Sequence, residues 1–199
     1  YDWLHQFPGY GQSTFRMSTQ MDSNASEWDK KYCEKGWFAR SMPDLNQANP
    51  LVLNYLTQNA IWWIEYADLD GLGIAKWTKA IMDEYPHFNI MGEVWLNQSA
   101  QVSYWQKDSP ISAIQSYNTY LPTVMDFPLF NAIGEAFRVA PSWDKGMIQL
   151  YDNLANDFLY KDINNLLIFA ENHDTARLNH AYPKIADYKL IISMLATAR

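Results

Sequence analysis

Two short stretches of this chain place carboxylates directly after apolar segments. Glu93 and Trp95 follow the run Phe88–Gly92, and Glu171-Asn172-His173-Asp174 follows the run Leu166–Phe169. Polar groups packed this closely are costly to bury in a core, whereas at the carboxyl ends of parallel strands they can face a ligand. Paired carboxylates are typical of sites that cleave glycosidic bonds. The sequence therefore predicts a sugar-directed site built from two strand ends.

Alternating helical and strand patterns would position these side chains. Asn49 followed by Pro50 predicts the start of a helix, and Pro86 predicts the end of another. The predicted helices are 50–66, 74–85, 130–139, 145–156 and 188–198, and the predicted strands are 88–92, 123–127 and 166–170. Such alternation indicates an α/β fold with a parallel sheet, either a barrel or a doubly wound sheet. Glycine-rich nucleotide-binding loops are absent, which disfavours a nucleotide-binding sheet.

The amino-acid composition limits the classes of binding partner that we expect. The 199 residues carry a net charge of −7, and no Lys/Arg cluster interleaves with aromatic residues, so a nucleic-acid partner is not expected. No apolar run has the length of a membrane span. Cys33 is the single cysteine, and we expect it to be a packed small apolar residue. Nine Trp and thirteen Tyr suit core packing and stacking on sugar rings. Residues 1–30 are polar and turn-rich, which predicts a loop.

Four motifs, in order along the chain, resemble the α-amylase family of glycoside hydrolases, in particular its bacterial neopullulanase/cyclomaltodextrinase branch. They are Met42–Asn46, Asp68–Leu72, Gly92–Trp95 and Glu171–Asp174. The resemblance implies a (β/α)₈ TIM barrel with its site at the carboxyl-terminal mouth. Only about half of that barrel has counterparts here, resembling strands 4 to 7. We therefore expect 1–199 to be part of one catalytic domain, with 1–50 forming the loop after the third strand and 51–199 forming strands 4–7 with their helices.

The sequence departs from the family pattern after Leu72. There the family continues into an Arg-x-Asp whose aspartate is the nucleophile, whereas Leu72 is followed by Gly73-Ile74. Either the segment has been deleted, or the natural protein carries further residues between Leu72 and Gly73. We favour the second alternative because both flanks resemble intact family sequence.

The resemblance also implies roles for individual residues. Glu93 would be the general acid/base and Asp174 the transition-state stabiliser, while His173, Trp95 and Arg177 would contact substrate. The substrate would be an α-1,4-glucan such as a maltooligosaccharide, cyclodextrin, pullulan or starch. Ca²⁺ is possible in the intact protein, although no metal-ligating set is recognised in these residues. The compartment is not determined by the sequence, and the resemblance suggests a periplasmic or secreted protein.

Several residues and functions keep more than one interpretation. Asp44, Asn46 and Asp126 are expected to brace loops, Asp70 to lie in a turn, and His5 and His180 to be surface or structural residues. Arg177 could pair with a carboxylate of the site or lie in the following loop. The alternatives to a hydrolase are a catalytically inactive glucan-binding module and a glucan transferase on the same scaffold. An unrelated doubly wound protein has only the generic alternation in its favour.

Overall fold

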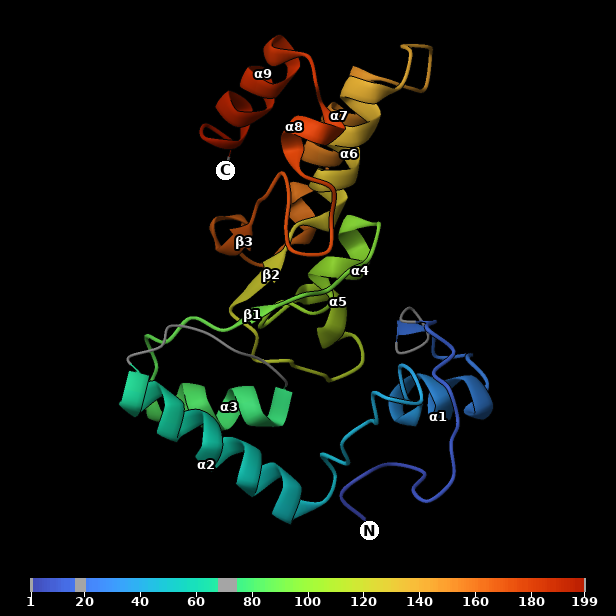
Figure 1. The fold of residues 1–199 in the computed structure, drawn as a ribbon, viewed down its shortest axis with the longest axis vertical. Helices are drawn as coiled ribbons and strands as arrows, with labels where there is room; N and C mark the ends of the chain where they lie inside the picture. The colour runs from blue at the N-terminus through green and yellow to red at the C-terminus, as the bar shows by residue number, and fades with distance from the viewer. Residues whose placement is uncertain (1, 17–20, 68–74, 199) are drawn as a thin grey trace. The chain divides into compact units, whose positions relative to one another are not determined.

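The computed structural model describes residues 2–16, 21–67 and 75–198 (Figure 1). Contacts divide the chain into two compact units. The first, called the N-terminal unit below, comprises residues 1–71 and 76–88, and the second, the C-terminal unit, comprises 72–75 and 89–199. Among the described residues, no helix combines the length and apolarity needed to cross a membrane.

A three-stranded parallel sheet organises the C-terminal unit (Figure 1). Its strands are β1 (Met91–Gly92), β2 (Thr123–Met125) and β3 (Leu166–Leu167), in the order β1-β2-β3. Met91 is in register with Thr123, and Val124 with Leu166. All three residues of β2 are buried, as expected for a central parallel strand covered on both faces. The predicted parallel α/β arrangement is therefore confirmed for this unit.

The strands are shorter than predicted, and polar side chains form hydrogen bonds next to the paired residues. Before β1, the Asn89 side chain accepts a 2.8 Å bond from the Thr123 hydroxyl. After β2, the buried Asp126 accepts a 3.0 Å bond from the backbone N–H of Leu129 and becomes a helix N-cap. The predicted strand 123–127 thus ends at Met125, and the helix predicted from Phe130 begins at Phe127. Asp126 has the bracing role expected of it.

Helices and short turns surround the sheet. They are α4 (Ser99–Ser103), α5 (Pro110–Ala113), α6 (Phe127–Arg138), α7 (Met147–Leu154), η2 (Asp157–Leu159), η3 (Ile163–Asn165), α8 (Leu178–Ala181) and α9 (Ile185–Leu195). Helices α6 and α7 pack closely on each other. One apolar cluster joins α6, α7, α8 and α9 through Leu129, Ile133, Leu150, Leu178 and Ile191. A smaller aromatic cluster, Phe127, Phe169 and Phe130, lies where β2 and β3 end.

The N-terminal unit contains α1 (Glu27–Lys35), α2 (Pro50–Ala67) and α3 (Ala75–Glu84). The Asn49 carboxamide accepts a 2.9 Å bond from the Leu51 N–H, so the predicted cap of α2 is confirmed. The Trp77 indole N–H donates to the Leu56 carbonyl at 3.2 Å and ties α3 to α2.

Two loop residues of this unit brace it as expected. Asp44 accepts from the backbone N–H of His5 through its carbonyl at 3.0 Å, and its carboxylate lies 2.5 Å from His5 Nδ1. Asn46 donates from its carboxamide to the Asp2 carbonyl at 2.9 Å.

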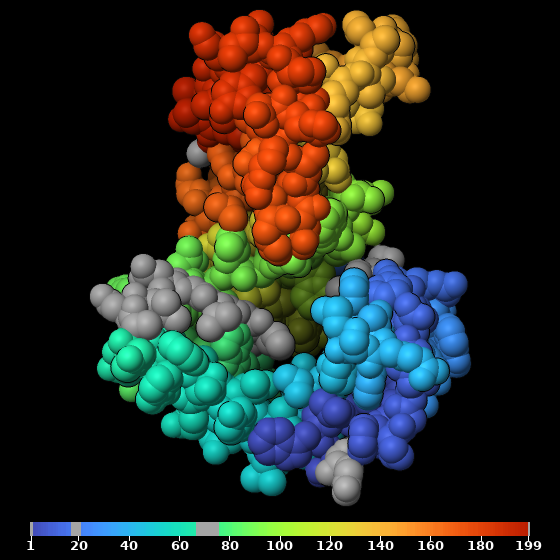
Figure 2. All heavy atoms as spheres, in the orientation of Figure 1, coloured from blue at the N-terminus to red at the C-terminus, as the bar shows by residue number. Residues whose placement is uncertain are grey.

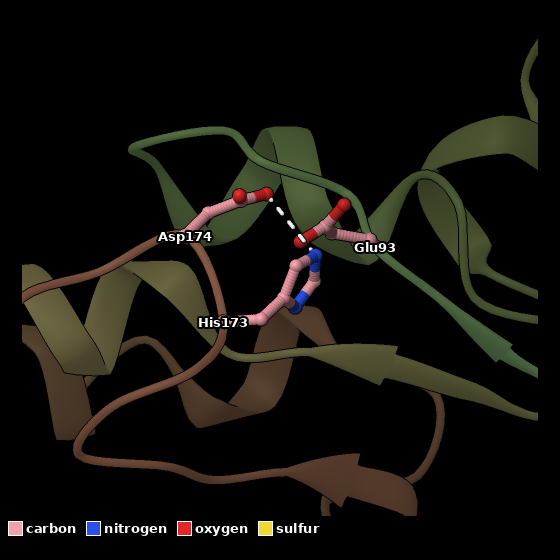
Figure 3. Close-up of side chains that lie close together, drawn as sticks. All are labelled: Glu93, His173 and Asp174. Atoms are coloured by element: carbon pink, nitrogen blue, oxygen red, sulfur yellow. Dashed lines mark ion pairs between the residues drawn. The ribbon is translucent and has the colours of Figure 1, made fainter.

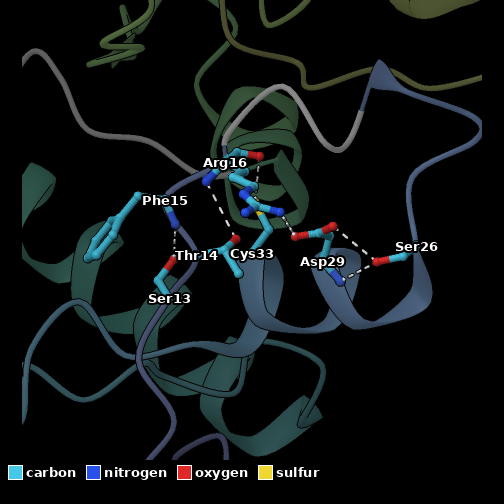
Figure 4. A network of polar contacts seen from close by, with 7 residues as sticks. All are labelled: Ser13, Thr14, Phe15, Arg16, Ser26, Asp29 and Cys33. Atoms are coloured by element: carbon cyan, nitrogen blue, oxygen red, sulfur yellow. Dashed lines mark hydrogen bonds and ion pairs between the residues drawn. The ribbon is translucent and has the colours of Figure 1, made fainter.

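Helix α1 lies within residues 1–50, which the sequence predicts to be a loop, and it begins inside the turn-rich stretch 1–30. Ser26 caps it by accepting from the Asp29 N–H at 3.0 Å, and Asp29 pairs with Arg16 at 2.7 Å (Figure 4). Cys33 lies on this helix, is half-buried, and its thiol contacts the Arg16 carbonyl at 3.5 Å (Figure 4). Burial raises the pKa of the Cys33 thiol, in line with a packed rather than a reactive cysteine.

Candidate active site

The ends of β1 and β3 bring three predicted site residues together. Glu93 directly follows β1, and His173 and Asp174 lie on the loop after β3 (Figure 3). One ligand atom from each of the three side chains lies within 4.8 Å of the other two. In the space-filling view the loop after β3, coloured orange-red, lies at the surface of the C-terminal unit (Figure 2). All three side chains are exposed, so a ligand can reach them.

Asn172 shapes the loop that carries His173 and Asp174. Its carboxamide oxygen accepts from the Asp174 N–H at 3.0 Å, and its own N–H donates to the Thr175 hydroxyl at 2.8 Å. Its carboxamide nitrogen lies 3.5 Å from a Glu93 carboxylate oxygen, at the long limit of a hydrogen bond. Asn172 thus has the turn-supporting role typical of an asparagine at this position, and it also connects the loop to Glu93.

His173 and Asp174 contact each other directly. His173 Nε2 lies 3.2 Å from Asp174 Oδ2, with side-chain exposures of 76% and 52% (Figure 3). The imidazole points toward Glu93 in the same view. One imidazole and two carboxylates can therefore face a single ligand. These side chains can donate hydrogen bonds to sugar hydroxyls and accept hydrogen bonds from them.

Trp95, two residues after Glu93, lies on an aromatic stack. Its ring stacks on Phe127 with centroids 4.7 Å apart and planes 15° apart, and Phe127 meets Phe169 edge-on at 5.0 Å. Phe127 is fully buried, whereas Trp95 is 49% exposed. One face of the indole is therefore anchored on the core while other parts of the ring are accessible, as stacking on a sugar requires.

Arg177 pairs with Glu171 and not with Glu93 or Asp174. Its guanidinium lies 3.1 Å from Glu171 Oε1, and the other Glu171 oxygen accepts from the backbone N–H of Leu178, the first residue of α8. The Leu178 N–H, with Arg177, holds the pKa of Glu171 below its ordinary value. Sequence reasoning gave Glu171 no role. A carboxylate shortly before a helix start was the available signal.

The same three side chains are the group that could hold a metal ion among the described residues. Ca²⁺ takes six to eight oxygen ligands. Two exposed carboxylates and an imidazole nitrogen do not match that preference, so the cluster does not fit Ca²⁺. The stretch Asp68–Leu72, with Asp70 and the Leu72–Gly73 junction, lies outside the described residues.

The fold and site define an α/β protein whose parallel strands end at a group of acidic and imidazole side chains. No model of a known protein family matches the chain. Among curated proteins, an intracellular maltogenic amylase of Bacillus subtilis is 32% identical over 154 residues, covering 71% of this chain and 24% of the relative. A cyclomaltodextrinase of a Bacillus species is 28% identical over 152 residues, covering 71% and 25%. This chain therefore spans about a quarter of the length of these two relatives.

Solved structures agree over nearly the whole chain. An α-amylase from Geobacillus thermoleovorans, complexed with acarbose, superposes with a TM-score of 0.71 at 25% identity, covering 99% of this chain and 42% of that one. A cyclomaltodextrin glucanotransferase, CldA, gives a TM-score of 0.74 at 20% identity, covering 100% and 37%; at that identity the likeness concerns the fold alone. The chain is similar to members of the α-amylase family of glycoside hydrolases, and its neighbours among these solved structures are TIM-barrel enzymes of that family.

Proposed function

We propose that this chain forms part of the catalytic barrel of a retaining hydrolase that cleaves α-1,4-glucosidic bonds, with β1, β2 and β3 as the fifth, sixth and seventh strands. The observation that carries the proposal is the approach, to within 4.8 Å, of acidic oxygens from Glu93 and Asp174, which follow different strands. Relatives named maltogenic amylase and cyclomaltodextrinase support an α-glucan substrate.

In the proposed reaction Glu93 is the general acid/base. Its carboxylic acid gives a proton to the glycosidic oxygen as the bond to the anomeric carbon breaks, and a nucleophilic carboxylate forms the glycosyl-enzyme. Glu93, now ionised, then takes a proton from water, whose oxygen attacks the anomeric carbon and releases the nucleophile. Asp174 stabilises the positive charge that develops on the sugar. The nucleophile belongs to a segment that the natural protein carries between Leu72 and Gly73.

His173, Trp95 and Arg177 complete the proposed site. In this proposal His173 hydrogen-bonds hydroxyls of the ring that is cleaved, and the exposed part of Trp95 stacks on a sugar; the exposure of both side chains supports these roles. Arg177 acts through Glu171, whose carboxylate it shares with the start of α8.

The test is reducing-sugar release from maltoheptaose by the protein and by Glu93→Gln. We expect turnover that the substitution reduces by about 10²- to 10⁴-fold, the usual contribution of a general acid/base. Turnover that is unchanged in Glu93→Gln would contradict the assignment. Mass spectrometry across the Leu72–Gly73 junction tests the nucleophile separately. A tryptic peptide that joins these residues directly would establish a true deletion.

A catalytically inactive glucan-binding module is the second candidate. The specific observation in its favour is that Leu72 is followed by Gly73-Ile74 and no Arg-x-Asp. Isothermal titration with maltoheptaose distinguishes the two candidates. Binding without turnover favours the module, and binding with turnover favours the hydrolase.

A further inference from the structure

A cavity in the C-terminal unit lies apart from the candidate site and is not lined by Glu93, Trp95, His173 or Asp174. It has a volume of about 360 Å³ and lies between the start of α4, the first turns of α6, the last turns of α7, and η2. This volume is at the lower end of the range of pockets that hold small molecules. Asn97, which lines it, is two residues after Trp95 on the same connection.

Side-chain amides dominate its lining. Six are present: Asn97, Gln98, Asn131, Gln149, Asn153 and Asn156. Each amide offers two N–H donors and a carbonyl acceptor, and a sugar hydroxyl both donates and accepts. Such a lining matches a polyhydroxylated ligand better than an apolar one.

The internal hydrogen bonds orient these amides. The Asn131 carboxamide nitrogen donates to the Asn97 carboxamide oxygen at 3.0 Å. This bond fixes the orientation of both amides, with the Asn131 oxygen as an acceptor and the Asn97 nitrogen as a donor for a ligand. Asn156 donates to the Asp152 carbonyl at 2.7 Å, and Gln149 to the Asp144 carbonyl at 2.6 Å. Side chains held in this way lose little further rotamer freedom when a ligand binds.

The floor and the charge of the cavity restrict the ligand further. Pro128 and Ala132 are buried and give an apolar patch for the C–H face of a sugar ring. Glu135 and Asp152 are carboxylates at the lining, and no Lys, Arg or His is among the described residues that line it. Phosphorylated or carboxylated ligands are therefore disfavoured by charge repulsion.

We propose that this cavity is a second carbohydrate site, which binds one or two neutral glucose units apart from the Glu93–Asp174 pair. The choice of glucose rests on the proposed function, whereas the choice of an uncharged over an anionic polyol rests on the lining alone. A site here would hold an α-glucan chain on the enzyme without touching the reacting bond.

The experiment is a titration of the isotope-labelled full chain with methyl α-glucoside, followed through the side-chain NH₂ signals of Asn and Gln. We expect the Asn131, Gln149 and Asn156 signals to shift in the wild type and in Trp95→Ala, which alters only the proposed active site. Asn131→Leu removes one amide and should weaken this binding about fivefold, the effect of losing one hydrogen bond. Asn164→Leu, outside the cavity on η3, is the matched control and should not change it.

Three results would overturn the proposal. These are the absence of shifts at the cavity amides with millimolar sugar, a shift confined to the side-chain NH₂ of Asn172 in the proposed active site, and stronger binding of glucose 6-phosphate than of the neutral sugar. Because the readout is binding and not turnover, it is independent of Glu93→Gln. If the cavity binds sugar but the protein does not hydrolyse glucans, the proposed hydrolase function is refuted and the proposed second carbohydrate site is supported.

Discussion

Replacing Asn172 by alanine tests whether the loop after β3 is organised for a sugar. The substitution removes the 3.0 Å bond to the Asp174 N–H and the 3.5 Å contact with Glu93, but keeps the backbone contacts of Asn172 with Thr175. One good hydrogen bond contributes about 0.5–1.5 kcal/mol, and the 3.5 Å contact contributes little. Asn172 is only partly buried, so the free energy of unfolding should fall by about 1 kcal/mol or less.

The expected loss of glucan binding is larger. In the proposed site His173 and Asp174 hydrogen-bond the sugar, and a bond to a charged group contributes about 1.5–3 kcal/mol. Losing the orientation of one such group should raise the Kd for maltoheptaose by about 10- to 100-fold. Isothermal titration gives the Kd and urea denaturation gives the unfolding free energy.

The control for this substitution is Asn164→Ala on η3, where the backbone N–H and not the side chain contacts Asp162. It should leave the Kd unchanged. A Kd for Asn172→Ala within twofold of the wild type, or a loss of stability that exceeds the loss of binding, would refute the reasoning.

Three further predictions address other parts of the C-terminal unit. Asp126→Ala should lower the unfolding free energy by about 1–2 kcal/mol because it removes a buried N-cap, and Asp126→Asn should cost less; urea denaturation measures both, and equal values would contradict the capping role. The pKa of Glu171 is lowered in the folded state, so the ionised carboxylate stabilises the fold above its ordinary pKa of 4.5, and this stabilisation is lost as the pH falls below that value. In Glu171→Gln the melting temperature should therefore depend less steeply on pH below 4.5. A slope equal to that of the wild type would contradict the prediction. Trp95→Ala should weaken maltoheptaose binding while costing about 0.5–1.5 kcal/mol of stability from the lost stack on Phe127; equal binding by calorimetry would exclude sugar stacking at Trp95.

Sequence patterns predicted the elements whose signals are local. Asn49 and Pro50 mark the start of α2 because capping and the fixed φ of proline act within one turn. Helix α3 was predicted from 74 to 85 and spans Ala75–Glu84. The runs before Glu93 and after Asn165 were recognised as strands because they are apolar, but their paired lengths depend on neighbours that a local pattern does not contain.

Other features needed the structure. Helix α1 has no buried residue, so apolar periodicity could not find it, although Ser26 followed by Asp29 is a capping signature. In the sequence Asp126 cannot be distinguished from a carboxylate that ends a strand and faces a ligand. It is a helix N-cap because α6 starts at Phe127 and Pro128. The stack of Trp95 on Phe127 joins residues whose proximity follows from tertiary packing, whereas the pairing of Arg177 with Glu171, six residues apart, depends on the course of the loop after β3.

The most direct test of the central claim is a double-mutant cycle on maltoheptaose binding with Glu93→Gln, Asp174→Asn and the double variant. Because their carboxylate oxygens lie within 4.8 Å, both side chains should act on the same sugar and show a coupling of at least about 0.5 kcal/mol. Changes in binding free energy that add within about 0.3 kcal/mol would place the two groups at independent sites and contradict the account.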